Sequence, residues 1–224
     1  MKPVKGLREV LFDTWGYDDF RPMQKPIVES INNGQDGLAI LSTGGGKSVC
    51  FQAPALANEG TAIVVSPLIS LMKDQVDALR DRGVRAGMVN SSLKPEIINA
   101  EIETLRNGGF KIFYVAPERL ISPDFIDVLK QVNVSFFAID ESHCISLWGH
   151  NFRLSYRGIV PVIRQIEEAQ NRRIQRVALT ATAKPETQKD IMESLGMKNA
   201  FHIVGDFDRK NIEINVRKSV NKTR

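Results

Sequence analysis

Short apolar runs alternate with longer amphipathic stretches along most of this 224-residue chain. The runs are rich in β-branched residues and are mostly continuous, which is typical of strands buried on both faces of a sheet. We predict strands at residues 37–41, 62–65, 87–89, 112–115, 136–139, 177–179 and 212–216.

The stretches between these runs carry apolar residues at helical spacing, and several begin with proline, whose missing N–H is harmless in a first helical turn. We predict helices at residues 22–32, 47–57, 68–82, 95–106, 123–130, 159–169 and 185–195. Strands and helices that alternate in this way indicate an α/β fold, a mostly parallel β-sheet with helices on both faces. Ligand sites in such sheets lie beyond the carboxyl ends of the strands.

Composition narrows the class of protein. Hydrophobic residues make up 42% of the chain and charged residues 25%, which is ordinary globular usage. The only two cysteines, Cys50 and Cys144, exclude a disulfide framework and a four-cysteine zinc site in this chain and favour a reducing, cytoplasmic setting. The first 16 residues lack the apolar segment of a signal peptide, and no apolar run approaches the roughly 18 residues of a membrane span.

The formal net charge of +4 permits an anionic partner but is weak evidence for one. Six basic and three acidic residues lie within 205–224, so the preceding residues carry a net charge of only +1. We therefore interpret 207–224 as a terminal strand and a basic linker.

A glycine-rich segment lies between a predicted strand and a predicted helix, and it comprises Thr43, Gly44, Gly45, Gly46, Lys47 and Ser48. Glycines let the backbone N–H groups turn toward phosphate oxygens, and the helix N-terminus adds its positive dipole end. Lys47 would reach the β- and γ-phosphates, and the Ser48 hydroxyl would bind Mg²⁺. Leu41 stands where the strict phosphate-loop pattern has glycine, so a plain glycine-rich turn is the alternative.

An acidic segment, Asp140-Glu141-Ser142-His143, follows the predicted strand 136–139. Asp140 can hold Mg²⁺ opposite Ser48, and Glu141 can orient and deprotonate the water that attacks the γ-phosphate. His143 is more specific to a nucleic-acid motor than to a simple NTPase. A solvated acidic turn is the alternative, and the phosphate loop upstream argues against it.

These segments, together with others in the same order along the chain, resemble the first RecA-like lobe of a superfamily 2 DExH-box helicase of the RecQ type. The resemblance covers nearly the whole chain through the blocks 16–24, 43–48, 66–75, 116–120, 140–143, 144–153, 179–183 and 207–211. In that superfamily the first phosphate-loop position is often not glycine, so Leu41 is compatible with the assignment.

The resemblance implies an adenine-recognition motif within 16–24. Gln24 would read the edge of adenine, because one amide can pair with both a donor and an acceptor. Tyr17 is suited to stacking on the base, and Arg21 belongs to the same motif.

The resemblance also implies contacts with nucleic acid. Trp148 and Phe152 would stack on unpaired bases and Arg153 would hold a phosphate, with a loop packed into the core as the alternative. Ser66, Pro67, Leu68 and Arg119 match segments that follow one strand, and Thr180 and Thr182 match the motif that links hydrolysis to strand movement. The chain departs from the family pattern at Leu147, Asn151 and Ser142, and the first two put the polar contacts of this loop in question.

On this interpretation, residues 1–206 are the first RecA-like ATP-binding domain, with the adenine-recognition motif and lead-in helices in 1–34. The resemblance implies ATP and Mg²⁺ as cofactors, and single-stranded or duplex-junction DNA and a second RecA-like lobe as partners. It implies 3′ to 5′ unwinding in recombination and repair by a cytoplasmic protein, at the nucleoid in a bacterium. We expect this chain alone not to unwind DNA. The alternatives are an RNA helicase lobe and a non-catalytic nucleotide-sensing module.

Overall fold

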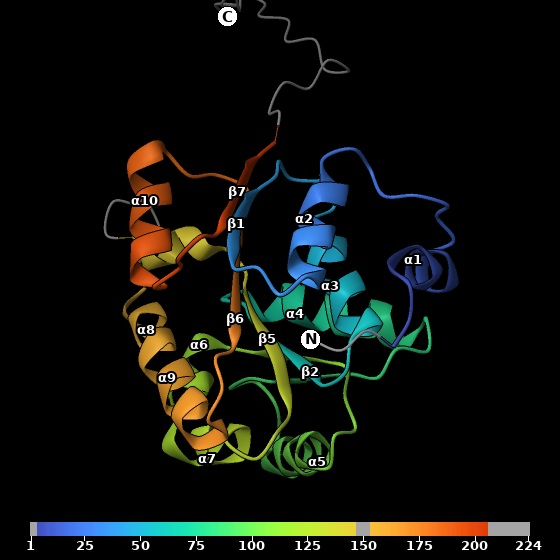
Figure 1. Ribbon diagram of the computed structural model, residues 1–224. Helices are drawn as coiled ribbons and strands as arrows, with labels where there is room; N and C mark the ends of the chain where they lie inside the picture. The colour runs from blue at the N-terminus through green and yellow to red at the C-terminus, as the bar shows by residue number, and fades with distance from the viewer. Residues whose placement is uncertain (1–3, 147–152, 206–224) are drawn as a thin grey trace, which may run out of the picture.

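The computed structural model describes residues 4–146 and 153–205 of the chain. Seven strands form a single sheet in the order β3-β4-β2-β5-β6-β1-β7, and every neighbouring pair is parallel (Figure 1). The strands are β1 (Gly37–Ile40), β2 (Thr61–Val65), β3 (Ala86–Val89), β4 (Ile112–Val115), β5 (Val134–Ile139), β6 (Gln175–Thr180) and β7 (Phe201–Val204).

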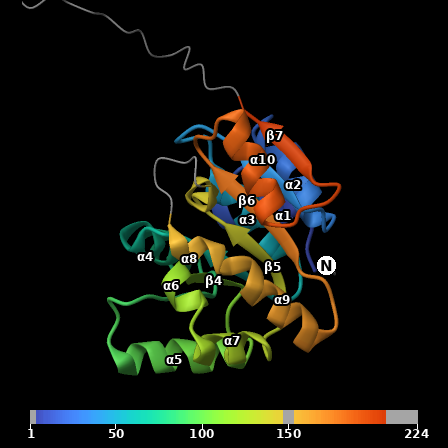
Figure 2. The ribbon, with the colours of Figure 1, turned by 90° about the vertical axis from the view of Figure 1, so that its left-hand side faces the viewer.

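Helices cover both faces of this sheet (Figures 1 and 2). One face carries α1 (Leu7–Trp15), α2 (Gln24–Asn32), α3 (Lys47–Ala57) and α4 (Ile69–Arg80). The other face carries α5 (Pro95–Arg106), α6 (Pro117–Leu120), α7 (Pro123–Leu129), the 3₁₀ turn η1 (Ser142–Ile145), α8 (Leu154–Arg157), α9 (Ile159–Gln170) and α10 (Pro185–Ser194). Proline occupies the first helical turn of α5, α6, α7 and α10, as the sequence suggested.

Two hydrophobic clusters form the core, one on each face of the sheet, because successive strand residues point to opposite faces. In β2, Ile63 and Val65 enter the cluster under α5 to α10, whereas Ala62 and Val64 enter the cluster under α1 to α4. Both faces of the central strands are therefore apolar, which explains the continuous apolar runs in the sequence.

The predicted α/β architecture is confirmed, and the strand pairing is parallel throughout. Strand β7 was not predicted, because at the edge of the sheet its residues alternate between partial burial and exposure and leave only a short, weak signal. The strand predicted at 212–216 lies outside the described residues. Within 4–146 and 153–205, no helix is both long and apolar enough to cross a membrane.

Candidate functional site

The candidate site lies at the carboxyl ends of three adjacent strands. The glycine-rich loop follows β1, Thr180 ends β6, and the acidic segment follows β5, and these strands are neighbours in the sheet. Parallel pairing puts all three ends at one edge, so residues about 100 positions apart in sequence meet there.

The glycine-rich loop has a backbone that requires glycine. Gly44 and Gly46 have φ angles of +80° and +79°, which side-chain-bearing residues rarely adopt. A Cβ atom at Gly46 would lie 2.1 Å from Nε2 of Gln24. Lys47 begins α3, and its Nζ donates a hydrogen bond to the Leu41 carbonyl at 3.3 Å, across the mouth of the loop.

The predicted adenine-recognition motif lies directly against this loop. Gln24 is buried, its Nε2 donates to the Gly46 carbonyl at 3.2 Å, and its Oε1 accepts from the Arg21 backbone N–H at 3.0 Å. The Arg21 guanidinium donates to the Gly44 carbonyl at 3.0 Å, and Tyr17 is 58% exposed. The contact of Gln24 with adenine stays a prediction.

The two carboxylates of the acidic segment have different environments. Burial, reinforced by the nearby charge of Glu141, raises the pKa of Asp140 to about 6. A hydrogen bond with His143 holds the pKa of Glu141 below its ordinary value, and their Oε2 and Nδ1 atoms lie 3.3 Å apart. At neutral pH Glu141 is therefore a carboxylate already engaged by His143.

His143 joins the acidic segment to the end of β6. Hydrogen bonds with the side chains of Cys144 and Glu141 raise its pKa to about 9, so the imidazole is protonated at neutral pH. Its Nδ1 also lies 2.9 Å from Oγ1 of Thr180, which in turn accepts from the Thr182 backbone N–H at 3.3 Å. The structure therefore brings together two motifs that the sequence had linked only by resemblance.

Most of the described residues predicted to bind nucleic acid border one open cavity of about 650 Å³. It lies beyond the ends of β2, β3 and β4 and includes Pro67, Arg119 and Arg153 in its lining. Leu68 is 44% exposed close by, whereas Ser66 is buried. Trp148 and Phe152 lie outside the described residues.

Arg119 is less free than its basic charge suggests. Its guanidinium donates to the Asp124 carboxylate at 2.6 Å and lies 5.7 Å from the centre of the Phe125 ring. Any contact of Arg119 with a phosphate would therefore compete with this ion pair.

One residue near the carboxylates escaped the sequence reasoning. Tyr156 is buried, and its hydroxyl donates to the backbone carbonyl of Asp140 at 2.9 Å. In the sequence, Tyr156 is an aromatic residue three positions after Arg153. Nothing in that position distinguishes it from an ordinary residue of the hydrophobic core.

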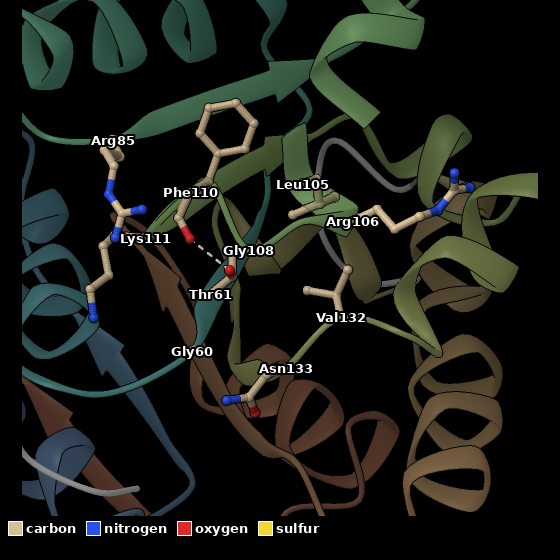
Figure 3. Close-up of a pocket in the computed structure, with 10 residues that line it drawn as sticks. All are labelled: Gly60, Thr61, Arg85, Leu105, Arg106, Gly108, Phe110, Lys111, Val132 and Asn133. Atoms are coloured by element: carbon tan, nitrogen blue, oxygen red, sulfur yellow. Dashed lines mark hydrogen bonds between the residues drawn. The ribbon is translucent and has the colours of Figure 1, made fainter. Parts of the chain in front are cut away.

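A separate cavity of about 240 Å³ lies at the opposite, amino-terminal ends of β2, β3, β4 and β5 (Figure 3). Its lining combines apolar side chains such as Phe110 and Val132 with the basic residues Arg85, Arg106 and Lys111. None of the predicted site residues that the structure describes is in its lining.

Known proteins resemble the chain over most of its length. The ATP-dependent DNA helicase RecQ of Bacillus subtilis is 43% identical over 97% of the chain, and the chain spans 36% of that protein. A putative ATP-dependent RNA helicase, R290, of Acanthamoeba polyphaga mimivirus is 40% identical over 96% of the chain, which spans 38% of that protein. The chain therefore corresponds to little more than a third of either relative.

Solved structures share the RecA-like fold at lower sequence identity. The helicase Lhr of Mycobacterium smegmatis, bound to single-stranded DNA and AMP-PNP, superposes with a TM-score of 0.69 at 18% identity, over 90% of this chain and 28% of Lhr. The model of one helicase family, described as DEAD/DEAH box helicase, matches residues 21–191. The matched range includes the glycine-rich loop, the acidic segment and strands β1 to β6, and the chain belongs to the DEAD/DEAH box helicase family.

Proposed function

We propose that this chain is the ATP-binding lobe of a RecQ-like, ATP-dependent DNA helicase that moves 3′ to 5′ and unwinds duplexes in recombination and repair. The observation that carries this proposal is the meeting of Lys47, Asp140 and Glu141 at the carboxyl ends of β1 and β5, which are separated in the sheet only by β6. The identity of 43% to a RecQ helicase supports the DNA assignment. Such a protein would work in the cytoplasm, at the nucleoid of a bacterium.

The residues assigned to ATP have complementary charges and hydrogen-bonding groups. Backbone N–H groups of 43–48 and the N-terminus of α3 would hold the phosphates, with Lys47 at the β- and γ-phosphates. Lys47 lies close enough to the acidic segment for its positive charge to act on Asp140. This charge lowers the pKa of Asp140, against the effect of burial. Glu141 would orient the attacking water, and His143 and Thr180 would hold Glu141 in place.

Ser48 and Asp140 fit a magnesium ion, because hydroxyl and carboxylate oxygens are hard ligands that this ion prefers. Asp140 lacks a basic hydrogen-bond partner among the described residues, and burial makes its ionised form costly. A bound Mg²⁺ would neutralise charge on the phosphates and favour the ionised form of Asp140.

The nucleic acid would pass beyond the ends of β2 and β4, over the 650 Å³ cavity. Its lining by Pro67, Arg119 and Arg153 supports contact with a phosphate backbone, which needs N–H and cationic donors without regard to base sequence. Trp148 and Phe152 would supply base stacking from the neighbouring loop.

The test is the rate of ATP hydrolysis by the full-length protein with single-stranded DNA, with RNA of the same sequence, and with neither. We expect stimulation by DNA. Stimulation by RNA alone would replace the DNA helicase with an RNA helicase, and nucleotide binding without any hydrolysis would favour a nucleotide-sensing module.

Substitution of the phosphate-loop lysine adds a second arm to this test. Lys47→Ala should abolish DNA-stimulated hydrolysis without lowering the melting temperature of the lobe. Lys189→Ala is the matched control, since Lys189 is an exposed lysine on α10 and pairs only loosely with Glu193, at 3.7 Å. If Lys47→Ala hydrolysed ATP at an unchanged rate, the assignment of residues 43–48 as the phosphate-binding loop would be wrong.

A further inference from the structure

The short segment from Arg153 to Tyr156 hydrogen-bonds to residues that follow three different strands, two in loops and one in the short helix α6. Arg153 Nη1 donates to the Pro67 carbonyl after β2 at 3.3 Å. Ser155 Oγ donates to Oε1 of Glu118 after β4 at 3.0 Å. Tyr156 then donates from its hydroxyl to the Asp140 carbonyl after β5, so one segment ties the acidic residues to the proposed path of nucleic acid.

The Asp140 contact differs from the other two because it is partly buried, whereas they are exposed. Tyr156 is 1% exposed and lies in the apolar cluster beneath α5 to α10. Burial raises the pKa of Tyr156, so its hydroxyl keeps its proton and stays a donor at any working pH. Loss of this donor would leave a partly buried carbonyl oxygen without its side-chain partner, which costs stability.

The peptide that Tyr156 holds is next to a strained residue. Glu141 has a φ of +46°, in the left-handed region that residues with a Cβ rarely adopt. Such a conformation persists only where its surroundings hold it. The hydrogen bond from Tyr156 to the preceding carbonyl is one such constraint, and it acts on the peptide that joins Asp140 to Glu141.

We propose that Tyr156 is a positioning residue for ATP hydrolysis, which fixes the backbone between Asp140 and Glu141 and thereby the directions of both carboxylates. Arg153 and Ser155 connect the same segment by hydrogen bonds to the residues that follow β2 and β4. Nucleic acid bound to those residues would therefore act on the carboxylates through Tyr156. This inference rests on the proposed function.

A second buried tyrosine offers a matched control. Tyr114 lies on β4, is 2% exposed, and its hydroxyl accepts a hydrogen bond from Gln52 Nε2 at 2.9 Å. Tyr114→Phe and Tyr156→Phe each remove one hydroxyl and one buried hydrogen bond. Tyr156 hydrogen-bonds to the backbone of the acidic segment, whereas Tyr114 hydrogen-bonds to Gln52 and interacts with Asp140 only through its charge. The pair therefore separates a loss of stability from a loss of backbone positioning.

The experiment measures steady-state ATP hydrolysis by the full-length protein at saturating single-stranded DNA, well below the melting temperature of every variant. We expect Tyr156→Phe to lower kcat about tenfold with KM for ATP changed less than about twofold, since a small displacement at the reacting groups affects chemistry more than binding. Tyr114→Phe should lower the melting temperature comparably and leave kcat within about twofold of the unmodified protein.

Equal loss of kcat in the two tyrosine variants, or an unchanged kcat in Tyr156→Phe, would overturn the inference. Ser155→Ala is a second variant at a half-buried site, and we expect reduced stimulation by DNA at unchanged hydrolysis without DNA. Full stimulation of Ser155→Ala would contradict the proposed route from nucleic acid. Absence of DNA stimulation in the unmodified protein would instead count against the proposed function.

Discussion

Asp140 and Glu141 are adjacent carboxylates, and their surroundings in the fold shift their pKa values in opposite directions. Burial and the charge of Glu141 raise the pKa of Asp140 to about 6, whereas His143 holds the pKa of Glu141 below its ordinary value. Among the described residues, Glu141 has the cationic side chain of His143 within hydrogen-bonding reach, whereas Asp140 has the charge of Lys47 nearby but no cationic hydrogen-bond partner. Asp140 is thus left to be compensated by a cation from outside the protein, and this suits the metal role proposed for it.

The raised pKa of Asp140 makes a prediction about stability. Its folded pKa lies above the ordinary value of 3.8, so the contribution of Asp140 to stability declines as the pH rises from about 4 to about 6 and then levels off. Without Mg²⁺ and nucleotide, Asp140→Asn should therefore be more stable than the unmodified chain at pH 7.5 by roughly 1–3 kcal/mol. The gain should shrink toward zero near pH 4.

Urea unfolding of both chains at the two pH values measures this difference. Addition of Mg²⁺ and ATP should stabilise the unmodified chain more than Asp140→Asn, since only a carboxylate compensates the ion. A variant that is less stable at pH 7.5, or equally shifted at both pH values, would contradict the assigned environment of Asp140.

Among the elements, β1 is the strand that leads into the phosphate loop, and its neighbour β7 fits closely against it. The Phe201 ring of β7 lies over Gly37, where a Cβ atom would come within 2.4 Å of the ring carbons. Beyond the strand, the Gly205 N–H donates to the Ile40 carbonyl at 2.7 Å. The edge strand thus supports the last residues before the loop.

Substitution of Gly37 tests this close fit. Gly37→Ala should destabilise the chain by about 1–3 kcal/mol, because the added methyl displaces the Phe201 ring. In a Phe201→Ala background the same change should cost much less, because the space is vacant. Chemical denaturation of the two single variants and the double variant measures the energetic coupling between positions 37 and 201.

Gly6→Ala is a suitable control, since a Cβ at Gly6 would meet only Glu9, at 3.9 Å. We expect its effect to be smaller than that of Gly37→Ala. If Gly37→Ala lowered the free energy of unfolding equally with and without the Phe201 ring, the contact between Gly37 and Phe201 would not account for the loss.

In the molecule as a whole, the candidate chemistry gathers at one end of the sheet. The phosphate loop, the acidic segment and the 650 Å³ cavity all lie at the carboxyl ends of the strands, whereas the cavity of Figure 3 lies at the amino ends. The chain spans 36% of the RecQ relative in Bacillus subtilis. We propose that a second lobe completes the motor and supplies cationic groups to the transferring phosphate.

The corresponding prediction is that this chain alone does not unwind DNA. Movement along a strand needs two bodies that grip it alternately, and arginines supplied from a second body accelerate phosphoryl transfer by about 10³–10⁵ where this has been measured. Unwinding is measured as strand separation of a fluorescently labelled duplex with a 3′ single-stranded tail, with the full-length protein as the positive control. Unwinding by the isolated chain would refute the need for a second lobe.

Much of this arrangement could be predicted from the sequence. Buried strands such as 112–115 are continuous apolar runs because both their faces are covered, and the helix at 47–57 begins at Lys47 as predicted. The phosphate loop and the acidic segment were found because their chemistry needs particular residues in short, contiguous stretches. Strand β7 and the short helices α6 and α8 were missed, because four residues carry too little periodicity to stand out.

The sequence by itself determined the fold class, the family and the two segments proposed for catalysis, since each depends on local pattern or on residues close together along the chain. Only the tertiary structure decided how His143 reaches Thr180, why Gly46 must lack a side chain beside Gln24, and that Tyr156 holds the carbonyl of Asp140. Those contacts depend on the order of strands and on burial. Both are properties of the packed sheet, and no single stretch of the chain records them.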